Sequence, residues 1–238
     1  MSEFLADLAE FLGDPATWSG PSGLPARTGE HLLLSAFALA VAAAITLPPA
    51  LWLGHRGRGG VAVGAVVNIG RAIPSFGIVA LMLPISLRFG WGIGYWPTFV
   101  ALVALAMPPI FTNTYTGITE VEGSVREAAL GMGMTGGQML TRTEVPLAMP
   151  VIWTALRVSA VQVVATATLG AVVGWGGLGR YVIDGFAQGN DVFVFVGGVV
   201  VAVLAILVDV AFSVAERFVL PAGTRHRDRT EMETTVPA

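Results

Sequence analysis

Long uncharged, apolar segments separated by short polar stretches make up most of the chain. A helix needs about 20 apolar residues to cross a bilayer, and the longest of these segments reach that length. We expect membrane-spanning helices at 32–54, 61–83, 96–117, 150–174 and 192–216. These segments are apolar on every side, whereas the strands of a membrane barrel would alternate apolar and polar residues. The pattern therefore predicts an all-α integral membrane protein with about five core spans.

Composition agrees with this prediction and excludes several classes of site. Of the 238 residues, 54% are hydrophobic and 12% are charged, whereas a soluble domain carries about 25% charged residues. A formal net charge of −3 provides no basic surface for nucleic acid. The absence of cysteine excludes disulfides, iron–sulfur clusters and cysteine zinc sites, and the absence of lysine excludes a P-loop. The three histidines are far apart, so we expect no metal site.

The arginines predict how the spans are oriented. Eight lie on one side of the predicted bilayer and three on the other. Cytoplasmic loops of membrane proteins are enriched in basic residues, so the side with eight arginines is expected to be the cytoplasm. This assignment places the N-terminus outside and the C-terminus inside. The eight are Arg56, Arg58, Arg126, Arg142, Arg217, Arg225, Arg227 and Arg229.

The two ends of the chain differ from the spans between them. Residues 1–30 mix acidic with apolar side chains and lack the basic flank of a signal peptide. We expect this segment to form an amphipathic helix on the extracytoplasmic membrane interface. The transmembrane domain is expected to cover 31–220. Residues 221–238 are rich in charge, Thr and Pro, and are expected to be a disordered cytoplasmic tail.

The cytoplasmic loop at 119–148 is too long for a simple turn. Ser124 and Glu127 have the spacing of a capping box, and Thr135 and Gln138 have the same spacing. Two glycines separate these boxes at the point where a helix would end. The spacing predicts two short helices that form an elbow, and local chemistry alone favours a capping role for Glu127.

The wider spacing of the loop indicates a second role. Glu127-Ala128-Ala129, followed by Gly133 and then by Thr143-Glu144-Val145-Pro146, resembles the EAA motif of ABC importer permeases. Thr143 and Val145 stand where the family pattern usually has larger aliphatic residues. The resemblance implies that the loop is a coupling helix that docks into a separate ATPase subunit, which binds ATP and Mg. The implied coupling residues are Glu127, Ala128, Ala129, Gly133 and Pro146.

Further strings resemble the glycine betaine, carnitine and choline branch of these permeases, over about residues 30–220. The resemblance implies a MetI-like type I importer transmembrane domain in the cytoplasmic membrane of a prokaryote. Its implied partners are the ATP-binding subunit, an external solute-binding protein, an identical or homologous second permease subunit and membrane lipids. We expect no cofactor on this chain and no enzymatic activity of its own. The strings are Ile73-Pro74-Ser75, Asn113-Thr114-Tyr115-Thr116-Gly117-Ile118, Thr166-Ala167-Thr168-Leu169 and Gly176-Gly177-Leu178-Gly179.

Two of the predicted spans each carry a polar stripe. An arginine in the middle of a span, here Arg71, indicates a functional site. A side chain that snorkels toward the membrane interface accounts for this arginine equally well. Ser and Thr also commonly join packed membrane helices. Two stripes in so apolar a protein nevertheless favour a water-accessible translocation path between them. The stripes are Asn68, Arg71 and Ser75 in the second span, and Ser159, Gln162 and Thr166 in the fourth.

The segment 174–179 matches the G-x-G-x-x-G dinucleotide pattern. That pattern needs a preceding strand and an acidic residue about 20 positions later, and here it follows a membrane span. We expect a flexible extracytoplasmic loop instead, with Gly176, Gly177 and Gly179 as candidates for an outer gate.

Arg157 and Asp209 are charges within the fourth and fifth predicted spans. With a rise of 1.5 Å per residue, each lies about 10 Å below the cytoplasmic interface. An unpaired charge at that depth costs about 3 kcal/mol. The matched depth predicts a buried salt bridge that fixes the packing of the two spans.

Together, these features predict the permease subunit of an ATP-driven importer that works by alternating access. The expected solute is a small osmoprotectant, namely glycine betaine, choline, carnitine or proline, and the first alternative is another small solute such as an amino acid. A secondary transporter would need coupling carboxylates within its spans and duplicated halves, and Asp209 is the one carboxylate placed well inside a predicted span. A scaffold subunit without transport activity is the last alternative, against which the two polar stripes argue.

Overall fold

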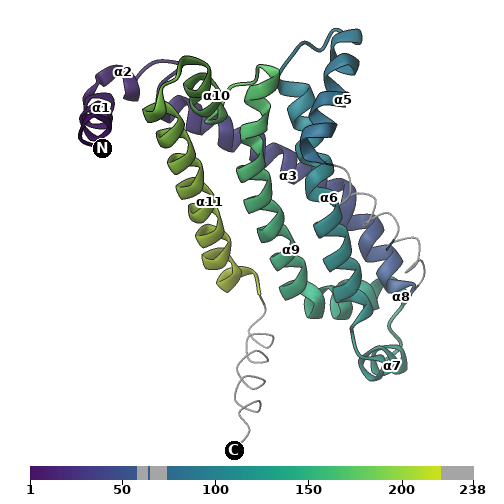
Figure 1. Cartoon of the computed structure of the whole chain (residues 1–238). Coiled ribbons are helices and arrows are strands. Elements are labelled where there is room, and N and C mark those ends of the chain that lie inside the picture. Colours follow the sequence, from purple (N-terminus) through teal and green to yellow (C-terminus); the bar gives the residue numbers. More distant parts are fainter. Residues whose placement is uncertain (58–63, 65–73, 221–238) are drawn as a thin grey trace, which may run out of the picture.

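The structure, a computed structural model, describes residues 1–57, 64 and 74–220 (Figure 1). Within these residues it contains helices and no strand, as the apolar pattern predicts. The helices are α1 (Ser2–Gly13), α2 (Pro15–Trp18), α3 (Leu24–His55), α5 (Ser75–Arg88), α6 (Tyr95–Thr119), α7 (Gly123–Gly131), α8 (Gly136–Met139), the π-helix η1 (Leu140–Glu144), α9 (Val145–Thr166), the 3₁₀-helix η2 (Ala167–Val173), α10 (Gly179–Gln188) and α11 (Asp191–Val219).

Among the described residues, four helical stretches are long and apolar enough to cross a membrane: α3, α6, the continuous stretch Gly136–Val173, and α11. They correspond to the first, third, fourth and fifth predicted spans. Most of the second predicted span, 61–83, lies outside the described residues. Its final part is α5, which continues past the predicted end to Arg88.

Two of the spanning helices begin earlier than the hydrophobic pattern predicts. α3 begins at Leu24, within the segment 1–30, and has a proline in its first turn, where the missing N–H has no helical partner to lose. The fourth stretch begins in α8 and reaches α9 through the π-helix. Val145 N–H donates to the Leu140 carbonyl across this π turn, directly before Pro146, which has no N–H to donate. Both extensions contain polar residues, so the hydrophobic pattern does not predict that the spanning helices begin there.

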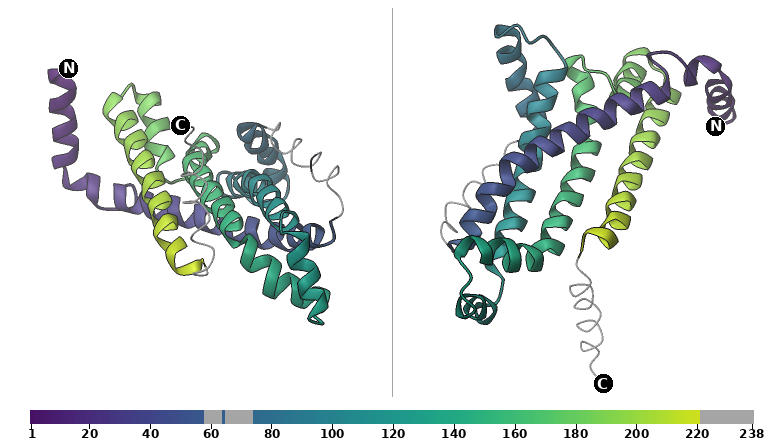
Figure 2. Two further views of the ribbon diagram at one scale, coloured as in Figure 1. Left: turned by 90° about the horizontal axis from the view of Figure 1, so that it is seen from below. Right: turned by 180° about the vertical axis from the view of Figure 1, so that it is seen from behind.

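The long helices lie side by side, and α3 crosses them obliquely (Figure 2). α3 packs against α6 and α9, α6 also packs against α9, and α5 packs against α6. α11 packs against the other side of α9. α9 is therefore the central helix of the bundle.

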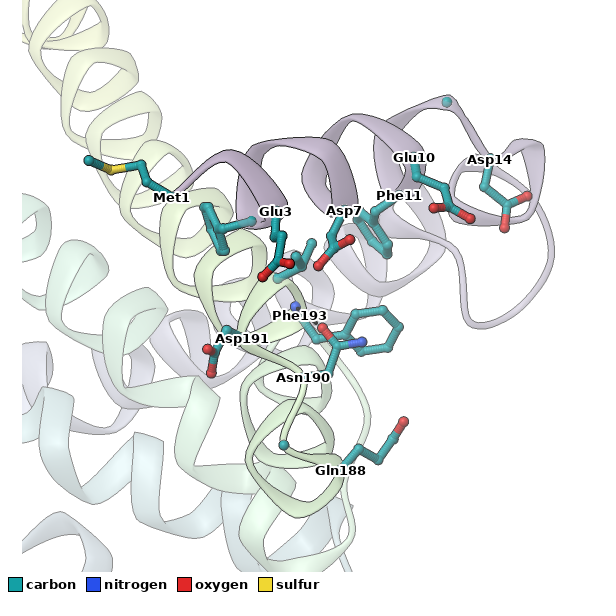
Figure 3. Close-up of a pocket in the computed structure, with 14 residues that line it drawn as sticks. Met1, Glu3, Asp7, Glu10, Phe11, Asp14, Gln188, Asn190, Asp191 and Phe193 are labelled. Atoms are coloured by element: carbon teal, nitrogen blue, oxygen red, sulfur yellow. Dashed lines mark hydrogen bonds between the residues drawn. The ribbon is translucent and has the colours of Figure 1, made fainter.

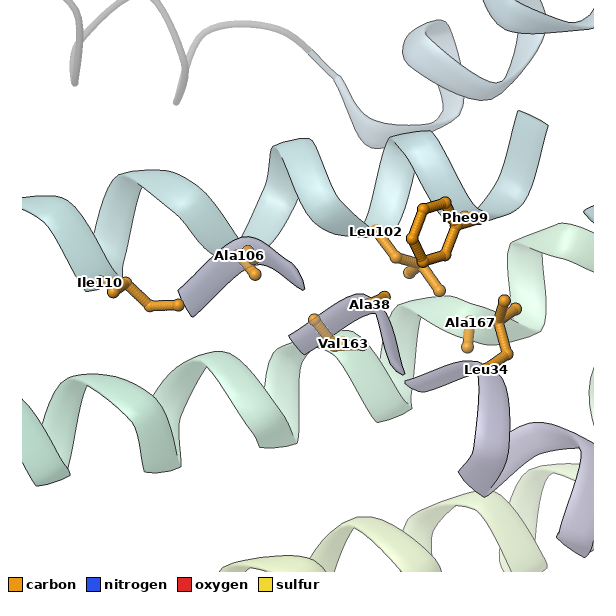
Figure 4. Packing of buried hydrophobic residues seen from close by; sticks show 9 residues of the cluster. Leu34, Ala38, Phe99, Leu102, Ala106, Ile110, Val163 and Ala167 are labelled. Atoms are coloured by element: carbon orange, nitrogen blue, oxygen red, sulfur yellow. The ribbon is translucent and has the colours of Figure 1, made fainter. Parts of the chain in front are cut away.

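The main core lies where α3, α6 and α9 meet (Figure 4). Ala38, Ala42 and Ala106 are fully buried there. Lipid is as apolar as the side chains, so close backbone approach at small residues holds membrane helices together. The larger side chains that fill the remaining space are Leu34, Phe99, Leu102, Ile110 and Val163.

The N-terminal segment forms the predicted helix, α1, and its apolar face is docked on the protein. The rings of Phe4 and Phe195 are 5.4 Å apart, and those of Phe11 and Phe193 are 5.2 Å apart. Both contacts join α1 to the start of α11. Leu5 is exposed, so α1 retains an apolar side chain for a membrane interface.

The elbow, defined here as α7 and α8 with the turn between them, lies at one end of the molecule (Figure 1). The last turns of α3 and α11 lie at this same end, which we call the elbow end. α1, α10 and the connection between α5 and α6 lie at the other end, which we call the opposite end. The predicted coupling residues and the predicted outer gate are thus on opposite ends of the bundle.

Candidate functional site

The elbow turns sharply at Gly133, between α7 and α8. Gly133 has a φ of +80°, in the left-handed region that glycine adopts at low cost. Its N–H donates to the Leu130 carbonyl at 2.9 Å, and the Met134 N–H donates to the Ala129 carbonyl at 3.1 Å. These two bonds form a Schellman motif, so Gly133 sets the bend between the two helices.

The two predicted capping boxes have different outcomes. The second is confirmed, because Thr135 N–H donates to Gln138 Oε1 at 2.8 Å and Gln138 N–H donates to Thr135 Oγ1 at 3.4 Å. The first is wrong, because α7 begins at Gly123 and its N-cap is Glu122. Ser124 therefore lies inside the first turn, and its hydroxyl donates to Glu122 Oε2 at 3.4 Å.

The elbow presents a surface of small and apolar residues at the tip of the molecule. Glu127 and Ala128 are exposed, whereas Ala129 is buried. Leu130 is 55% exposed and Met132 is 71% exposed. Met is an adaptable side chain that is frequent on protein-binding surfaces, so this part of the elbow has the character of a docking surface.

Beneath the elbow, a buried carboxylate joins three elements, and the sequence reasoning missed it. The Glu144 side chain, at the end of η1, is 0% exposed, and its Oε2 lies 2.6 Å from His55 Nδ1. Its Oε1 lies 3.0 Å from Arg126 Nε, in an ion pair whose N–H is not aligned for a hydrogen bond. Pro146, two residues later in the first turn of α9, is half-buried. A carboxylate at the start of an apolar helix was the available signal, because once buried it needs a partner.

The polar stripe predicted for the second span falls largely outside the structure's coverage. Asn68 and Arg71 are not among the described residues. Ser75 is the first residue of α5, where it is half-buried. The structure therefore places one member of this stripe.

On α9 the predicted stripe divides between two environments. Ser159 is fully buried, and its hydroxyl donates to the Ala106 carbonyl of α6 at 3.4 Å. Gln162 is exposed and Thr166 is half-buried. Ser159 thus joins two packed helices and does not line an open surface, which corrects its assignment to a path. Gln162 and Thr166 remain candidates for such a surface.

The glycine loop at the opposite end, which the sequence predicts to be flexible, makes close contacts with α3 and η2. Gly177 N–H donates to Glu30 Oε2 at 2.8 Å, and that oxygen also accepts from Arg27 at 2.9 Å. A Cβ on Gly176 would collide with the Glu30 carboxylate, and a Cβ on Gly179 would collide with the backbone of η2. All three predicted gate glycines therefore allow this loop to lie against α3 and η2.

The start of α10 is anchored near this loop. Tyr181 donates its hydroxyl hydrogen to the Ser22 carbonyl at 2.8 Å. Burial raises the pKa of the Tyr181 phenol, and the positive charge of Arg27 opposes that shift. The phenol therefore stays protonated and remains a hydrogen-bond donor across the neutral pH range.

The structure brings Arg157 and Asp209 together between α9 and α11. Arg157 Nε lies 2.6 Å from Asp209 Oδ1, and Arg157 Nη2 lies 2.6 Å from Asp209 Oδ2. The side chains are 31% and 42% exposed. This bidentate pair therefore lies at the surface of the subunit, whereas the sequence predicts a buried salt bridge. One turn earlier, Trp153 Nε1 donates to the Phe212 carbonyl at 3.0 Å. α9 and α11 are thus joined by two polar contacts.

An open pocket of about 960 Å³ lies at the opposite end, between α1 and the start of α11 (Figure 3). Most of its charged side chains are carboxylates on α1, and Asp191 of α11 also lines it. Within the described residues, no group of His, Cys, Asp or Glu is arranged to hold a metal ion. The pocket gives this end of the subunit a negative surface. The α1 carboxylates are those of Glu3, Asp7 and Glu10, and Asp14, which directly follows α1, also lines the pocket.

Residues 32–220 match a protein family described as binding-protein-dependent transport system inner membrane component. The chain belongs to this family. The match includes the elbow, the glycine loop and all but the first turns of α3. The family resemblance and the MetI-like fold predicted from the sequence are confirmed.

Relatives of this inner membrane component align with most of its length. It is 36% identical over 197 residues to the glycine betaine/carnitine/choline transport system permease protein OpuCB of Bacillus subtilis, an alignment that covers 83% of this chain and 88% of the relative. It is 35% identical to the choline transport system permease protein OpuBB of the same organism, with the same coverage. It is 32% identical to the osmoprotectant import permease protein OsmW of Salmonella typhimurium, covering 85% of this chain and 94% of the relative.

The fold of this inner membrane component also resembles a solved transporter. Superposition on a chain of the MetNI methionine ABC transporter, in an inward-facing conformation, gives a TM-score of 0.74 at 25% sequence identity. The superposition covers 88% of this chain and 100% of the other. The bundle is therefore that of an ABC transporter membrane domain.

Proposed function

We propose that this chain is the permease subunit of an ATP-driven importer for a small osmoprotectant: glycine betaine, choline, carnitine or proline. The observation that carries the proposal is the similarity of more than four fifths of the chain to permeases named for such solutes. An amino acid such as methionine is the second candidate, because the fold resembles the methionine transporter. It ranks second because the sequence identity to the methionine transporter chain is 25%, whereas the identity to the glycine betaine/carnitine/choline permease is 36%.

The elbow is the element that docks into the ATPase subunit. Its exposed Leu130 and Met132 provide apolar contact area, and the exposed Ala128 lets a partner approach the backbone closely. Gly133 holds this surface in a fixed bend, and Pro146 begins the helix to which the elbow is attached. The ATPase holds ATP and Mg, and this chain receives the movement that accompanies hydrolysis.

The elbow end lies in the cytoplasm and the opposite end outside. Arg56, Arg126, Arg142 and Arg217 all belong to the elbow end of the bundle, which supports this orientation through the enrichment of basic residues in cytoplasmic loops. The external binding protein then docks on the opposite end, beside the acidic pocket. A second permease subunit completes the path in the cytoplasmic membrane of a prokaryote.

The path for the solute runs along the exposed and half-buried polar side chains of α9 and the start of α5. Gln162, Thr166 and Ser75 are the described residues that support it, and Asn68 and Arg71 precede them in the chain. Asp209 is the carboxylate that a proton-coupled secondary transporter would use. Both of its oxygens are bound to Arg157, which favours an ATP-driven mechanism with alternating access.

The test is uptake by proteoliposomes that contain the permease and the ATPase from the same genome, with the binding protein added outside. We expect uptake of radiolabelled glycine betaine or choline that requires both enclosed ATP and the binding protein. Methionine uptake in place of these solutes would establish the second candidate. Uptake that proceeds without ATP would contradict the importer proposal.

A further inference from the structure

Glu144 lies at the junction between the elbow and the membrane-spanning helices. It is the last residue of η1 and directly precedes α9. Its side chain is 0% exposed, and a buried carboxylate is stable only when it is paired. The identity of its partners therefore shows which elements this residue holds together.

The two partners come from two other elements. His55, whose Nδ1 lies 2.6 Å from the carboxylate, is the last residue of α3. Arg126, whose Nε lies 3.0 Å from the carboxylate, belongs to α7 and directly precedes Glu127 of the EAA-like motif. Arg126 also donates from Nη2 to the Ile118 carbonyl, at the end of α6, at 2.6 Å. A single carboxylate thus connects α3, α9 and the first arm of the elbow, and its arginine partner adds the end of α6.

The second arm of the elbow contacts the same cluster. A Cβ on Gly136, the first residue of α8, would lie 3.2 Å from His55 Nε2, so α8 packs closely over the imidazole ring. At the base of the cluster, a Cβ on Gly54 would lie 2.9 Å from Ile118 Cβ. The ends of α3 and α6 are therefore in direct contact under the elbow. Each arm of the elbow contacts at least one of these two helix ends.

We infer that Glu144 is a positioning residue that makes the elbow move as one body with α3 and α9. The inference rests on the proposed function, because it concerns how movement of the ATPase reaches the spans. The outer surface of the elbow is exposed, and at its attachment to the bundle the side chains of His55 and Arg126 both pair with this carboxylate. Without that charge, the elbow would follow the ATPase while the spans lag behind.

The functional experiment measures ATP hydrolysis and glycine betaine uptake in parallel, in proteoliposomes of the assembled importer. Glu144→Gln keeps the size of the side chain and removes its charge. Glu120→Gln makes the same change at an exposed site on the same end of the bundle and serves as the control. We expect Glu144→Gln to lower uptake per ATP hydrolysed at least about fivefold, the lower end of the usual coupling between sites, with hydrolysis retained. Glu120→Gln should leave the ratio unchanged.

A merely structural role predicts a different result. Fewer folded complexes would lower hydrolysis and uptake together and leave their ratio unchanged, and an unchanged ratio overturns the inference. If Glu144→Gln does not assemble, Arg126→Gln and His55→Gln remove the partners one at a time at partly exposed positions. Each should lower the ratio in the same way.

A distance measurement tests the inference independently of the solute. The chain has no cysteine, so Arg56→Cys beside α3 and Ser124→Cys on α7 provide two spin-label sites, both exposed. In the complex with the ATPase, we expect one narrow distance that does not change when an ATP analogue binds. Glu144→Gln should broaden this distance or make it depend on nucleotide. A distance that stays narrow and constant in the variant overturns the inference, even if the wild type imports a solute other than an osmoprotectant.

Discussion

At the scale of single residues, the backbone angle of one glycine determines the shape of the elbow. Gly133 has a φ of +80°, and no atom lies within 4 Å of a Cβ built on it. Space for a side chain is therefore available, and the restriction on this position is conformational. A non-glycine residue in the left-handed region costs about 1–2 kcal/mol, and Asn tolerates that region better than other residues.

Substitutions at Gly133 should consequently rank by their tolerance of the left-handed region. We expect Gly133→Val to lose most of its binding to the ATPase, because a β-branched residue would force the elbow to refold. Gly133→Asn should retain clearly more binding. Co-purification of the ATPase with each variant measures the effect, normalised to the amount of permease in the membrane. Equal losses of binding for Gly133→Val and Gly133→Asn would indicate that docking requires the absence of a side chain at this position. The backbone angle would then not be the cause.

At the scale of elements, α9 is held to α11 by the Arg157–Asp209 pair and by the bond from Trp153. The pair is partly exposed, so its contribution depends on whether lipid, water or a neighbouring subunit covers it. Replacing one member leaves the other charge unpaired at membrane depth, which is unfavourable. Exchanging the two residues restores the pairing, with the negative charge now on α9 and the positive charge on α11.

We therefore expect Arg157→Asp and Asp209→Arg each to lower the yield of folded permease, and the double variant to recover part of that loss. Folded yield is measured by size-exclusion chromatography of the detergent-solubilised protein, together with its thermal midpoint. A double variant as poor as the sum of the single losses would show that the contact does not stabilise the fold.

Neighbouring glycines in α11 provide a sharper test of packing between elements. A Cβ on Gly197 would lie 2.8 Å from Tyr181 Cβ on α10, whereas nothing lies within 4 Å of a Cβ on Gly198. We expect Gly197→Ala to destabilise the permease by about 1–3 kcal/mol, the usual cost of overpacking. Gly198→Ala should be neutral or slightly stabilising, because Ala favours a helix over Gly. Thermal unfolding of both variants checks the ranking, and the reverse order would refute the α10–α11 contact.

The elements differ in how well the sequence predicts them, and the reasons are physical. Long apolar runs predict α6 and α11 because every face of a spanning helix meets lipid or protein. The early start of α3 is not predictable in this way, because its first turns are polar. The pairing of Glu144 with His55 joins residues 89 positions apart. Ser159 and Gln162 look alike in the sequence, as members of one polar stripe. In the structure, α6 covers Ser159 and leaves Gln162 exposed.

At the scale of the whole molecule, the two ends have different chemistry. The elbow end combines arginines with exposed apolar residues, and the opposite end carries the acidic pocket between α1 and α11. The orientation proposed above assigns the first end to the cytoplasm. It also exposes the negative pocket to the exterior, where it favours a binding protein with basic residues on its docking face.

This orientation is testable because the chain contains no cysteine. Ala187→Cys on α10 and Ser124→Cys on α7 each introduce one exposed thiol at opposite ends of the bundle. A membrane-impermeant maleimide should label Ala187→Cys in intact cells, and Ser124→Cys after the membrane is permeabilised. Labelling in the reverse order would invert the topology and remove the basis for an elbow in the cytoplasm.

The π-helix between the elbow and α9 restricts how the length of this chain can vary. Its five residues, Leu140–Glu144, contain one residue more than an α-helical path through the same turn would use. The π turn already holds this extra residue, so one further residue inserted in α8 or η1 would turn the helix by about 100° and rotate the elbow relative to α9. Arg126 would then face away from Glu144. Insertions between Gly133 and Pro146 should therefore be far less tolerated than changes of residue type, so the length of this interval is itself a functional property of the chain.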